Sequence, residues 1–393
     1  MTIYDMGREK QMGDLTNERL KSLDALRGFD MFFIMGGATL IVMLCKAFGL
    51  GTDSWLVLQM GHVAWNGLHH FDTIFPLFLF IAGASWPYSY AKQQERGMSK
   101  GAIALRCLRR GLVLTFLGLW VGGFFGFDFA HLRFWSVLGR IGLAWMIGAW
   151  LYMLLGIRAR LAAAALILIA SWLFFRFVPA PDAATFVCPE SLSSLAKLGN
   201  GPFTPIGDFG CWVDRTIFGA HSYSRLYDPE GSSGFFPAIV TAMLGMFAGD
   251  WIRRANLSGN KKTLGLFAFA ALSACGAWVL SFSCPIVKAL WSPTFVLAVG
   301  CYSFAMLGAF YWIIDVKGFA KWSFPFQVIG LNSITIYLGQ AIIGFKVAAN
   351  FFFGGAARLV GEPWGSVITA AGYVLVCWLF LYFLYRKKTF LRV

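Results

Sequence analysis

Ten apolar runs, each about long enough to cross a lipid bilayer, divide this chain of 393 residues. A helix crosses the hydrocarbon core with about 20 mostly apolar residues, because each residue advances it by about 1.5 Å. Only 13% of the residues are charged, whereas a soluble domain has about 25%. The pattern excludes a soluble enzyme, a disordered chain and a secreted disulfide scaffold, and it predicts an all-α polytopic membrane protein. The predicted spans are 28–50, 70–91, 104–126, 136–156, 160–179, 235–252, 263–283, 292–314, 323–345 and 364–385.

The segments that join these runs differ in their content of Lys and Arg. Of the 33 basic residues, 23 fall on the side of the N-terminus and nine on the other side, and the remaining one, Arg140, lies within a predicted span. Because cytoplasmic loops carry such an excess, both termini are predicted to be cytoplasmic, and the net charge of +14 does not indicate a nucleic-acid partner. We expect a cytoplasmic segment 1–27, a transmembrane domain 28–385 with outer loops 51–69 and 180–234, and a cytoplasmic tail 386–393.

The outer loop between the first two spans contains the residues best suited to chemistry. His62 and Asn66 lie in this loop, and Asp72 begins the next span. An imidazole exchanges its proton near neutral pH, so His62 is a candidate general base or nucleophile, and a nearby carboxylate would orient the ring. The alternative, given equal weight, is an interfacial anchor at headgroup level. A metal site formed by His62, His69, His70 and Asp72 is a minor alternative, and we expect no metal.

Ionisable residues also occur where the membrane makes charge costly. Asp24, Arg27 and Asp30 are spaced three apart at the inner end of the first span, so they share a helix face, and an ion pair is the simplest interpretation. Arg140 lies within the fourth span and requires a carboxylate partner or an anionic ligand. Other basic residues cluster at the inner face, where most would determine topology near anionic lipid and two or three would suit a nucleotide-like ligand. These are Arg106, Arg109, Arg110, Arg253, Arg254, Lys261 and Lys262.

Two further patterns concern packing and covalent links. Glycines four residues apart occur at Gly118, Gly122 and Gly126 and again at Gly245 and Gly249, a spacing that lets helices approach closely within or between chains. The long outer loop contains two cysteines, which would form a disulfide in an oxidising compartment and otherwise remain two free thiols. They are Cys188 and Cys211.

Five short motifs, in a constant order, give the chain a resemblance to a known family. The motifs are RLKSLDALRG at 19–28, HVAWNGL at 62–68 followed by Asp72 and Pro76, YDPEG at 227–231, DVKG at 315–318 and GLNSI at 330–334. From about residue 19 to the C-terminus, the chain resembles the heparan-alpha-glucosaminide N-acetyltransferase family. It also resembles bacterial relatives within this family, some of which are labelled N-acetylglucosamine-related membrane proteins.

The resemblance implies a membrane-embedded acyltransferase that takes acetyl-CoA from the cytosolic side and delivers the acetyl group to an amino sugar or cell-envelope glycan on the outer side. His62 matches the family's catalytic histidine, as a base or as a covalent acyl carrier, with Asp72 as its orienting carboxylate and Asn66 as a donor to the developing oxyanion. A homodimer in a bacterial inner membrane is also implied. The candidate donor-binding residues are Arg27, Arg106, Arg110, Arg140 and Asn332, and the candidate acceptor-binding residues are Trp65, Asp228 and Glu230.

The sequence departs from the family in two places. Human-type members carry a large luminal domain and an extra span ahead of the first run, and we expect neither here. At Met35-Gly36-Gly37-Ala38 the sequence lacks an Asn that those members have. The resemblance therefore does not require a heparan end as the acceptor. The alternative function is a transporter of N-acetylglucosamine or a related sugar, with the outer aromatics and the polar intramembrane residues as its site.

Overall fold

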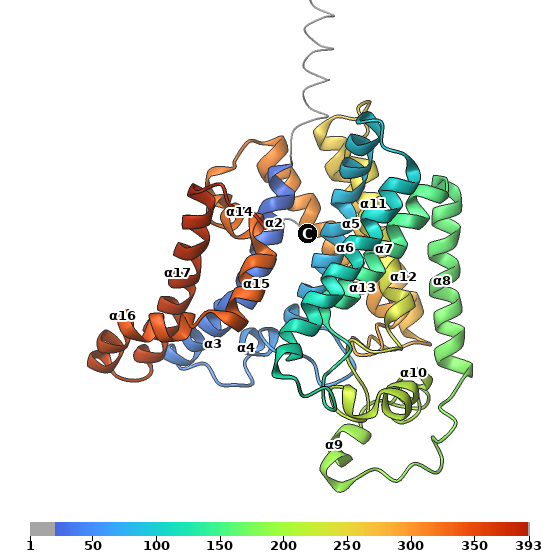
Figure 1. Cartoon of the computed structure of the whole chain (residues 1–393), viewed down its shortest axis with the longest axis horizontal. Helices are drawn as coiled ribbons and strands as arrows, with labels where there is room; N and C mark the ends of the chain where they lie inside the picture. Colours follow the sequence, from blue (N-terminus) through green and yellow to red (C-terminus); the bar gives the residue numbers. More distant parts are fainter. Residues whose placement is uncertain (1–19, 392–393) are drawn as a thin grey trace, which may run out of the picture.

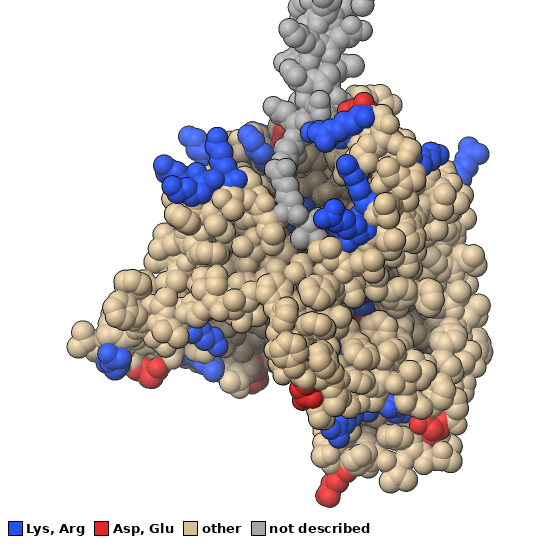
Figure 2. All heavy atoms as spheres, in the orientation of Figure 1, with Lys and Arg blue, Asp and Glu red and all other residues tan. Residues whose placement is uncertain are grey.

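A computed structural model describes residues 20–391 as a bundle of helices (Figure 1). We call the end where residues 96–99 join two long helices the basic end, and the opposite end, which carries residues 178–234, the loop end. Figure 2 shows Lys and Arg side chains gathered around a hollow at the basic end. Most of the predicted segment 1–27 (residues 1–19, which include Arg19 of the first motif) and the last two residues of the predicted tail lie outside the described residues.

Eight helices within residues 20–391 are long and apolar enough to cross a membrane, or nine if a bent pair is counted as one span. They confirm an all-α polytopic membrane protein, and they match eight of the ten predicted spans. A ninth predicted span corresponds to α6 (Lys100–Val121), which packs along α7 but carries three arginines in its first half. The eight are Lys21–Ala47 (α2, η1 and α3), His70–Glu95 (α5), Val137–Leu154 (α7), Ile157–Phe177 (α8), Phe235–Ile252 (α11), Gly259–Ser281 (α12), Pro293–Val316 (α13 and η6) and Trp364–Arg386 (α17).

The predicted span 323–345 is wrong as a single helix. The chain instead forms α14 (Phe324–Leu331) and α15 (Ser333–Ile342), followed by α16 (Phe345–Val360) at an angle of 79° to α15. Asn332 separates the first two helices, with φ −129° and ψ 33°. Its side chain donates to the Thr389 carbonyl (3.1 Å) and accepts from the Leu391 amide (3.3 Å). Asparagine competes with helical hydrogen bonding in this way, and here it ties the end of the chain to the basic end of the bundle.

The first span is also irregular. A π-helical turn, η1 (Phe33–Gly37), separates α2 (Lys21–Phe32) from α3 (Ala38–Ala47). Gly36 within it has φ 108°, a conformation that glycine adopts at little cost and other residues rarely adopt. The sequence Met35-Gly36-Gly37-Ala38, where the chain departs from the family pattern, therefore forms a kink.

The two cysteines of the long loop, Cys188 and Cys211, are free thiols. Cys211 is buried within the loop, and its sulfur atom lies 4.0 Å from the Ser233 hydroxyl. Burial raises the pKa of the Cys211 thiol well above its ordinary value.

Short helical elements fill the connections between the long helices. They are α4 (Trp55–Gln59), η2 (Phe124–Gly126), η3 (Glu190–Leu192), α9 (Ser193–Ala196), α10 (Phe209–Val213), η4 (Asp214–Phe218), η5 (Gly219–His221) and, at the basic end, η7 (Lys321–Ser323).

Helices α5 and α11 approach so closely that only glycine fits between them. A Cβ atom on Gly245 would lie 1.9 Å from the Phe80 carbonyl oxygen, and one on Gly83 would lie 2.1 Å from the Ala242 carbonyl oxygen. The spacing of glycines on α11 therefore serves packing within one chain. This contact fixes α5, whose first turn carries Asp72.

We expect Gly245→Ala to destabilise the fold by about 1–3 kcal/mol, because the new methyl group can be accommodated only if the two helices separate. Thermal unfolding in detergent measures the effect. Gly101→Ala, on the exposed start of α6 with no atom within 4 Å of the new Cβ, is the matched control. Equal melting temperatures for the two variants would contradict the close approach.

Candidate active site

His62 and Asp72 form a hydrogen-bonded pair at the loop end of α5. The His62 Nδ1 atom lies 2.7 Å from Asp72 Oδ1. The second carboxylate oxygen accepts from the backbone amides of Val63 (3.2 Å) and His69 (3.1 Å). The Asp72 side chain is 2% exposed and that of His62 is 53% exposed. The carboxylate is therefore held rigidly and in turn orients an accessible imidazole. Because a carboxylate accepts, we assign the imidazole proton to Nδ1, which leaves the lone pair on Nε2.

Lys288 completes this group, and nothing in the sequence pattern pointed to it. Its Nζ atom lies 3.0 Å from His62 Nδ1, 3.5 Å from His62 Nε2 and 3.3 Å from Asp72 Oδ1. Burial lowers the pKa of Lys288, while the negative charge of Asp72 opposes that shift. The ammonium group therefore lies at an imidazole edge that is accessible to a ligand.

The loop that carries Lys288 is bound to the His62 segment by backbone pairing. Asn66 forms an isolated antiparallel bridge with Val287, and the Gly67 amide donates to the Ile286 carbonyl (2.9 Å). A few residues later, Trp291 is fully buried and has φ 49°, a left-handed conformation that costs a non-glycine residue about 1–2 kcal/mol. Backbone strain of this kind persists where surrounding packing fixes it, often beside a functional site.

A cavity of about 730 Å³ runs from the basic end to His62. Cavities of about 300–1,000 Å³ are typical of small-molecule sites. Its wall changes character along its length. At the basic end it is lined by Arg27, Ser85, Ser89, Lys92 and Arg110; in the middle by apolar side chains that include Met31, Phe75, Phe78, Leu114 and Ile141; and at the loop end by His62, Phe71, Glu230 and Lys288.

Glu230 is positioned by two arginines. Arg133 pairs with the carboxylates of both Asp228 and Glu230. Arg140 donates to the backbone carbonyls of Pro229 (3.1 Å) and Gly231 (2.6 Å). The sequence indicated a carboxylate or an anionic ligand for Arg140, but its hydrogen bonds go to these carbonyls instead. Asp228 is fully buried in this network, whereas Glu230 faces the cavity.

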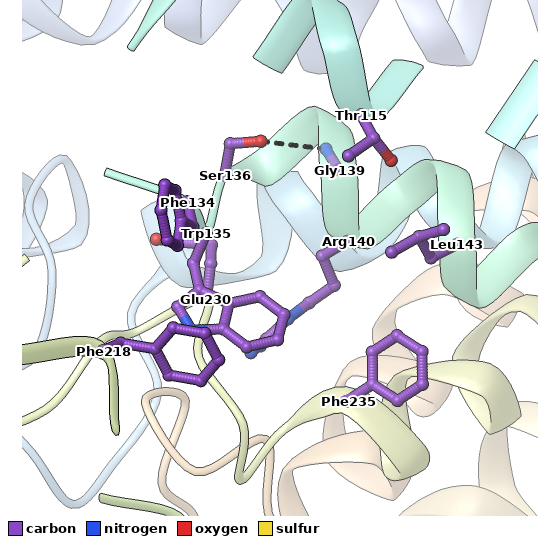
Figure 3. A pocket seen from close by; sticks show the side chains of 10 residues that line it. All are labelled: Thr115, Phe134, Trp135, Ser136, Gly139, Arg140, Leu143, Phe218, Glu230 and Phe235. Carbon is purple, nitrogen blue, oxygen red and sulfur yellow. Dashed lines mark hydrogen bonds between the residues drawn. The ribbon is translucent and has the colours of Figure 1, made fainter. Parts of the chain in front are cut away.

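Asp214 also holds the segment that carries Glu230. Its carboxylate accepts from the amide and the hydroxyl of Ser232 (2.9 and 2.8 Å). Burial raises the pKa of Asp214 to about 6. Figure 3 shows Arg140 reaching from α7 toward Glu230, among the rings of Trp135, Phe218 and Phe235. These side chains line a smaller pocket of about 100 Å³ beside the main cavity.

The other residues singled out from the sequence lie in different surroundings. Trp65 is buried and donates its indole N–H to the Phe203 carbonyl (2.8 Å), so it anchors the long loop. Asn66 is exposed and is not among the residues that line the cavity. Arg27 and Arg110 line the cavity, whereas Arg106 lines a separate groove. Asn332 binds the end of the chain, next to residues 330–331 and 333–334 of the cavity wall.

The four candidate metal ligands do not converge. His69 Nδ1 lies 3.2 Å from the Gly61 carbonyl oxygen, and His70 packs against Phe33 with its Nδ1 3.3 Å from the Tyr302 hydroxyl. Within residues 20–391, no cluster of three or more His, Cys, Asp or Glu side chains is placed to hold a metal ion. Of the four side chains, only those of His62 and Asp72 contact each other, while His69 contacts the Asp72 carboxylate through its backbone amide.

Comparison with known proteins extends over nearly the whole chain. No family model matches it. The chain is similar to heparan-alpha-glucosaminide N-acetyltransferase of Homo sapiens, with 27% identity over 95% of this chain and 60% of that protein. It is similarly related to the Mus musculus protein of the same name, with 26% identity over 95% of this chain and 61% of that protein. The chain thus spans about three fifths of the length of these curated relatives.

Proposed function

We propose that the chain is a transmembrane acetyltransferase that uses acetyl-CoA, because it is similar over 95% of its length to heparan-alpha-glucosaminide N-acetyltransferases. The donor enters the cavity at the basic end, on the cytosolic side, and its acetyl group passes to the amine of an amino sugar or glycan at the loop end. The observation that carries this proposal is the cavity itself, because it joins a cationic opening to the His62–Asp72 pair.

The charge and length of the cavity suit the donor. Arg27, Lys92 and Arg110 lie at the end that would receive the phosphates of CoA. Arg27 donates to Ser85 (3.3 Å). Ser85 lies thirteen residues after Asp72 on α5, which separates the two residues by a rise of about 20 Å. The pantetheine arm, extended, covers about 15 Å at about 1.2 Å per bond. A nucleotide held at the basic end would therefore bring its thioester close to His62.

The loop end provides groups for acetyl transfer. As the acceptor nitrogen attacks the thioester carbon, Nε2 of His62 takes a proton from the nitrogen. The C–S bond then breaks, and the same proton passes to the sulfur, so that the products are the acetylated amine and CoA thiol. Asp72 stabilises the imidazolium that exists between the two transfers. We assign the stabilisation of the negative charge on the carbonyl oxygen to Lys288 in place of Asn66, because the Lys288 Nζ atom lies 3.5 Å from His62 Nε2.

The acceptor is expected to carry an amine. Among the described residues, Glu230 supplies the one carboxylate that lines the cavity, and it lies at the same end as His62. An ammonium group attracted to this carboxylate would lose its proton before it attacks. Asp228 and Trp65 are both buried within the protein, where they support the structure of this end of the site.

We expect Lys288→Met to lower the rate of acetyl transfer by about 10²-fold or more, the usual cost of removing one donor to an oxyanion. The affinity for acetyl-CoA should change little, because the phosphates bind at the other end of the cavity. Transfer of radiolabelled acetyl from acetyl-CoA to glucosamine measures the rate. Lys346→Met, which removes an exposed lysine at the start of α16, is the matched control.

The donor is tested by thermal unfolding of the purified chain in detergent with acetyl-CoA or desulfo-CoA. A ligand present at a hundred times its dissociation constant stabilises the folded state by about 2.7 kcal/mol. We expect both ligands to raise the melting temperature of the natural chain, and Arg110→Gln to weaken both effects. No stabilisation of correctly folded protein would refute the donor assignment. Sugar flux in vesicles that is indifferent to CoA would then favour the transporter of N-acetylglucosamine.

A further inference from the structure

A second hollow, a groove of about 790 Å³, is lined by residues of α6 and α15. It is separated from the main cavity by side chains of α6 and α15, and the two share only Arg110 and Leu391. Ile342 and Ile343 line the groove and are 59% and 41% exposed. In a helix bundle that crosses a membrane, such apolar exposure faces lipid. The groove is therefore accessible from the bilayer.

Three arginines lie at the end of this groove nearest the basic end. Arg106, Arg109 and Arg110 are spaced three and four residues apart on α6, so their like charges repel one another. Within residues 20–391, none of the three pairs with a carboxylate. Arg106 donates to the neutral Gln93 (3.4 Å), and the Nε atom of Arg110 is buried without a hydrogen-bond partner in this part of the chain. An anionic group bound here would relieve the repulsion.

The remainder of the groove is apolar and is long enough to hold much of an acyl chain. From Arg109 to Trp120, the last residue but one of α6, the helix rises about 16 Å. The groove therefore leads from the arginines toward the loop end of the bundle. Leu117 on α6 and Leu338 on α15 line the space between. An acyl chain of ordinary length would fit along this wall.

We propose that the groove is a binding site for an anionic phospholipid of the leaflet at the basic end. The phosphate contacts Arg106 and Arg109, and one acyl chain lies between α6 and α15. A free phosphate ligand would not account for the apolar wall, and a neutral lipid would not account for three arginines that have no carboxylate partner among residues 20–391. This site is distinct from the proposed donor site, because Arg106 and Arg109 line the groove and not the cavity.

The test uses the full chain, purified in an uncharged detergent, and measures the melting temperature as lipid is added. We expect dioleoyl phosphatidylglycerol to stabilise the protein at lower concentration than dioleoyl phosphatidylcholine, and glycerol 3-phosphate to have no effect. Each basic side chain near a membrane surface contributes about a fivefold gain in affinity for anionic lipid. The double variant R106Q/R109Q should therefore bind phosphatidylglycerol about 25-fold more weakly.

Two further variants separate the parts of the site. Arg158→Gln removes an exposed arginine at the same end of the bundle and should leave the phosphatidylglycerol effect unchanged. Gly339→Leu fills the apolar wall and should weaken binding although all three arginines remain. The proposal is overturned if the two lipids act equally, if R106Q/R109Q retains the full effect, or if glycerol 3-phosphate alone reproduces it.

Discussion

Replacing His62 with alanine is expected to lower the rate of acetyl transfer by about 10²–10⁴-fold, the range that a positioned acid–base group contributes. Without the imidazole, the reaction loses the group that takes the proton from the acceptor and returns it to sulfur, because the other carboxylate at this end of the cavity, that of Glu230, is paired with Arg133. Binding of acetyl-CoA should persist, because the cationic side chains Arg27 and Arg110 lie at the other end of the cavity. The rate is measured with glucosamine, and donor binding by thermal shift.

The control for this variant is His131→Ala. His131 also pairs with a carboxylate, that of Asp128 (2.9 Å), but both side chains are largely exposed and neither lines the cavity. It should retain the full rate. If His62→Ala keeps a rate within a few-fold of the natural chain, His62 is a loop anchor and the proposed mechanism is wrong.

Asp72→Asn is expected to reduce the rate by about 10²–10⁴-fold as well, although the new side chain has the same shape. The carboxylate accepts hydrogen bonds on both oxygens, from His62 on one side and from the amides of Val63 and His69 on the other. An amide group must turn its NH₂ toward one of these donors. The imidazole then loses either its fixed orientation or the charge that stabilises the imidazolium. The ammonium of Lys288, which is partly buried, also loses the carboxylate that lies 3.3 Å away.

A loss of activity through unfolding must be separated from a loss of orientation, because Asp72 also caps the first turn of α5. The rate is therefore compared only for protein that unfolds cooperatively and whose melting temperature is raised by acetyl-CoA, because such protein is folded and binds the donor. Asp128→Asn, which alters the exposed pair with His131, should have no effect. A folded Asp72→Asn variant with a near-normal rate would remove the carboxylate from the mechanism.

Most of the fold follows from hydropathy, because apolar runs of about 20 residues allow few structures other than spanning helices. The exception, 323–345, shows what hydropathy does not contain. Asn332 gives up helical hydrogen bonding to bind Thr389 and Leu391, about 57 residues away. That contact depends on where the end of the chain packs, and the sequence around Asn332 does not reveal it.

The candidate site was only partly predictable for the same reason. His62 and Asp72 are ten residues apart, so a short loop brings them together. Lys288 is 226 residues from His62, and it resembles any other outer lysine until the backbone bridge between Asn66 and Val287 is known. Conversely, Trp65 appeared suited to binding a sugar, but its indole N–H is already satisfied by the Phe203 carbonyl.

Arginines near one another in the sequence also separate in space. Arg106 and Arg110 are one helical turn apart, and both were candidates for donor binding. In the structure Arg110 lines the cavity and the groove, whereas Arg106 lines the groove alone. Positions four apart lie on nearly the same face of a helix. The neighbouring helices, rather than the spacing, therefore determine which ligand each guanidinium meets.

The face from which acetyl-CoA binds tests the central claim most directly. The donor carries several negative charges and does not cross a bilayer unaided, so vesicles that hold the chain in a single orientation present it to one face at a time. We predict that radiolabelled acetyl-CoA binds when the face with Lys92 and Arg110 is exposed, and that Arg110→Gln weakens this binding. Binding only from the face that carries His62, or from neither, would contradict a donor held at the basic end and reacting at the loop end.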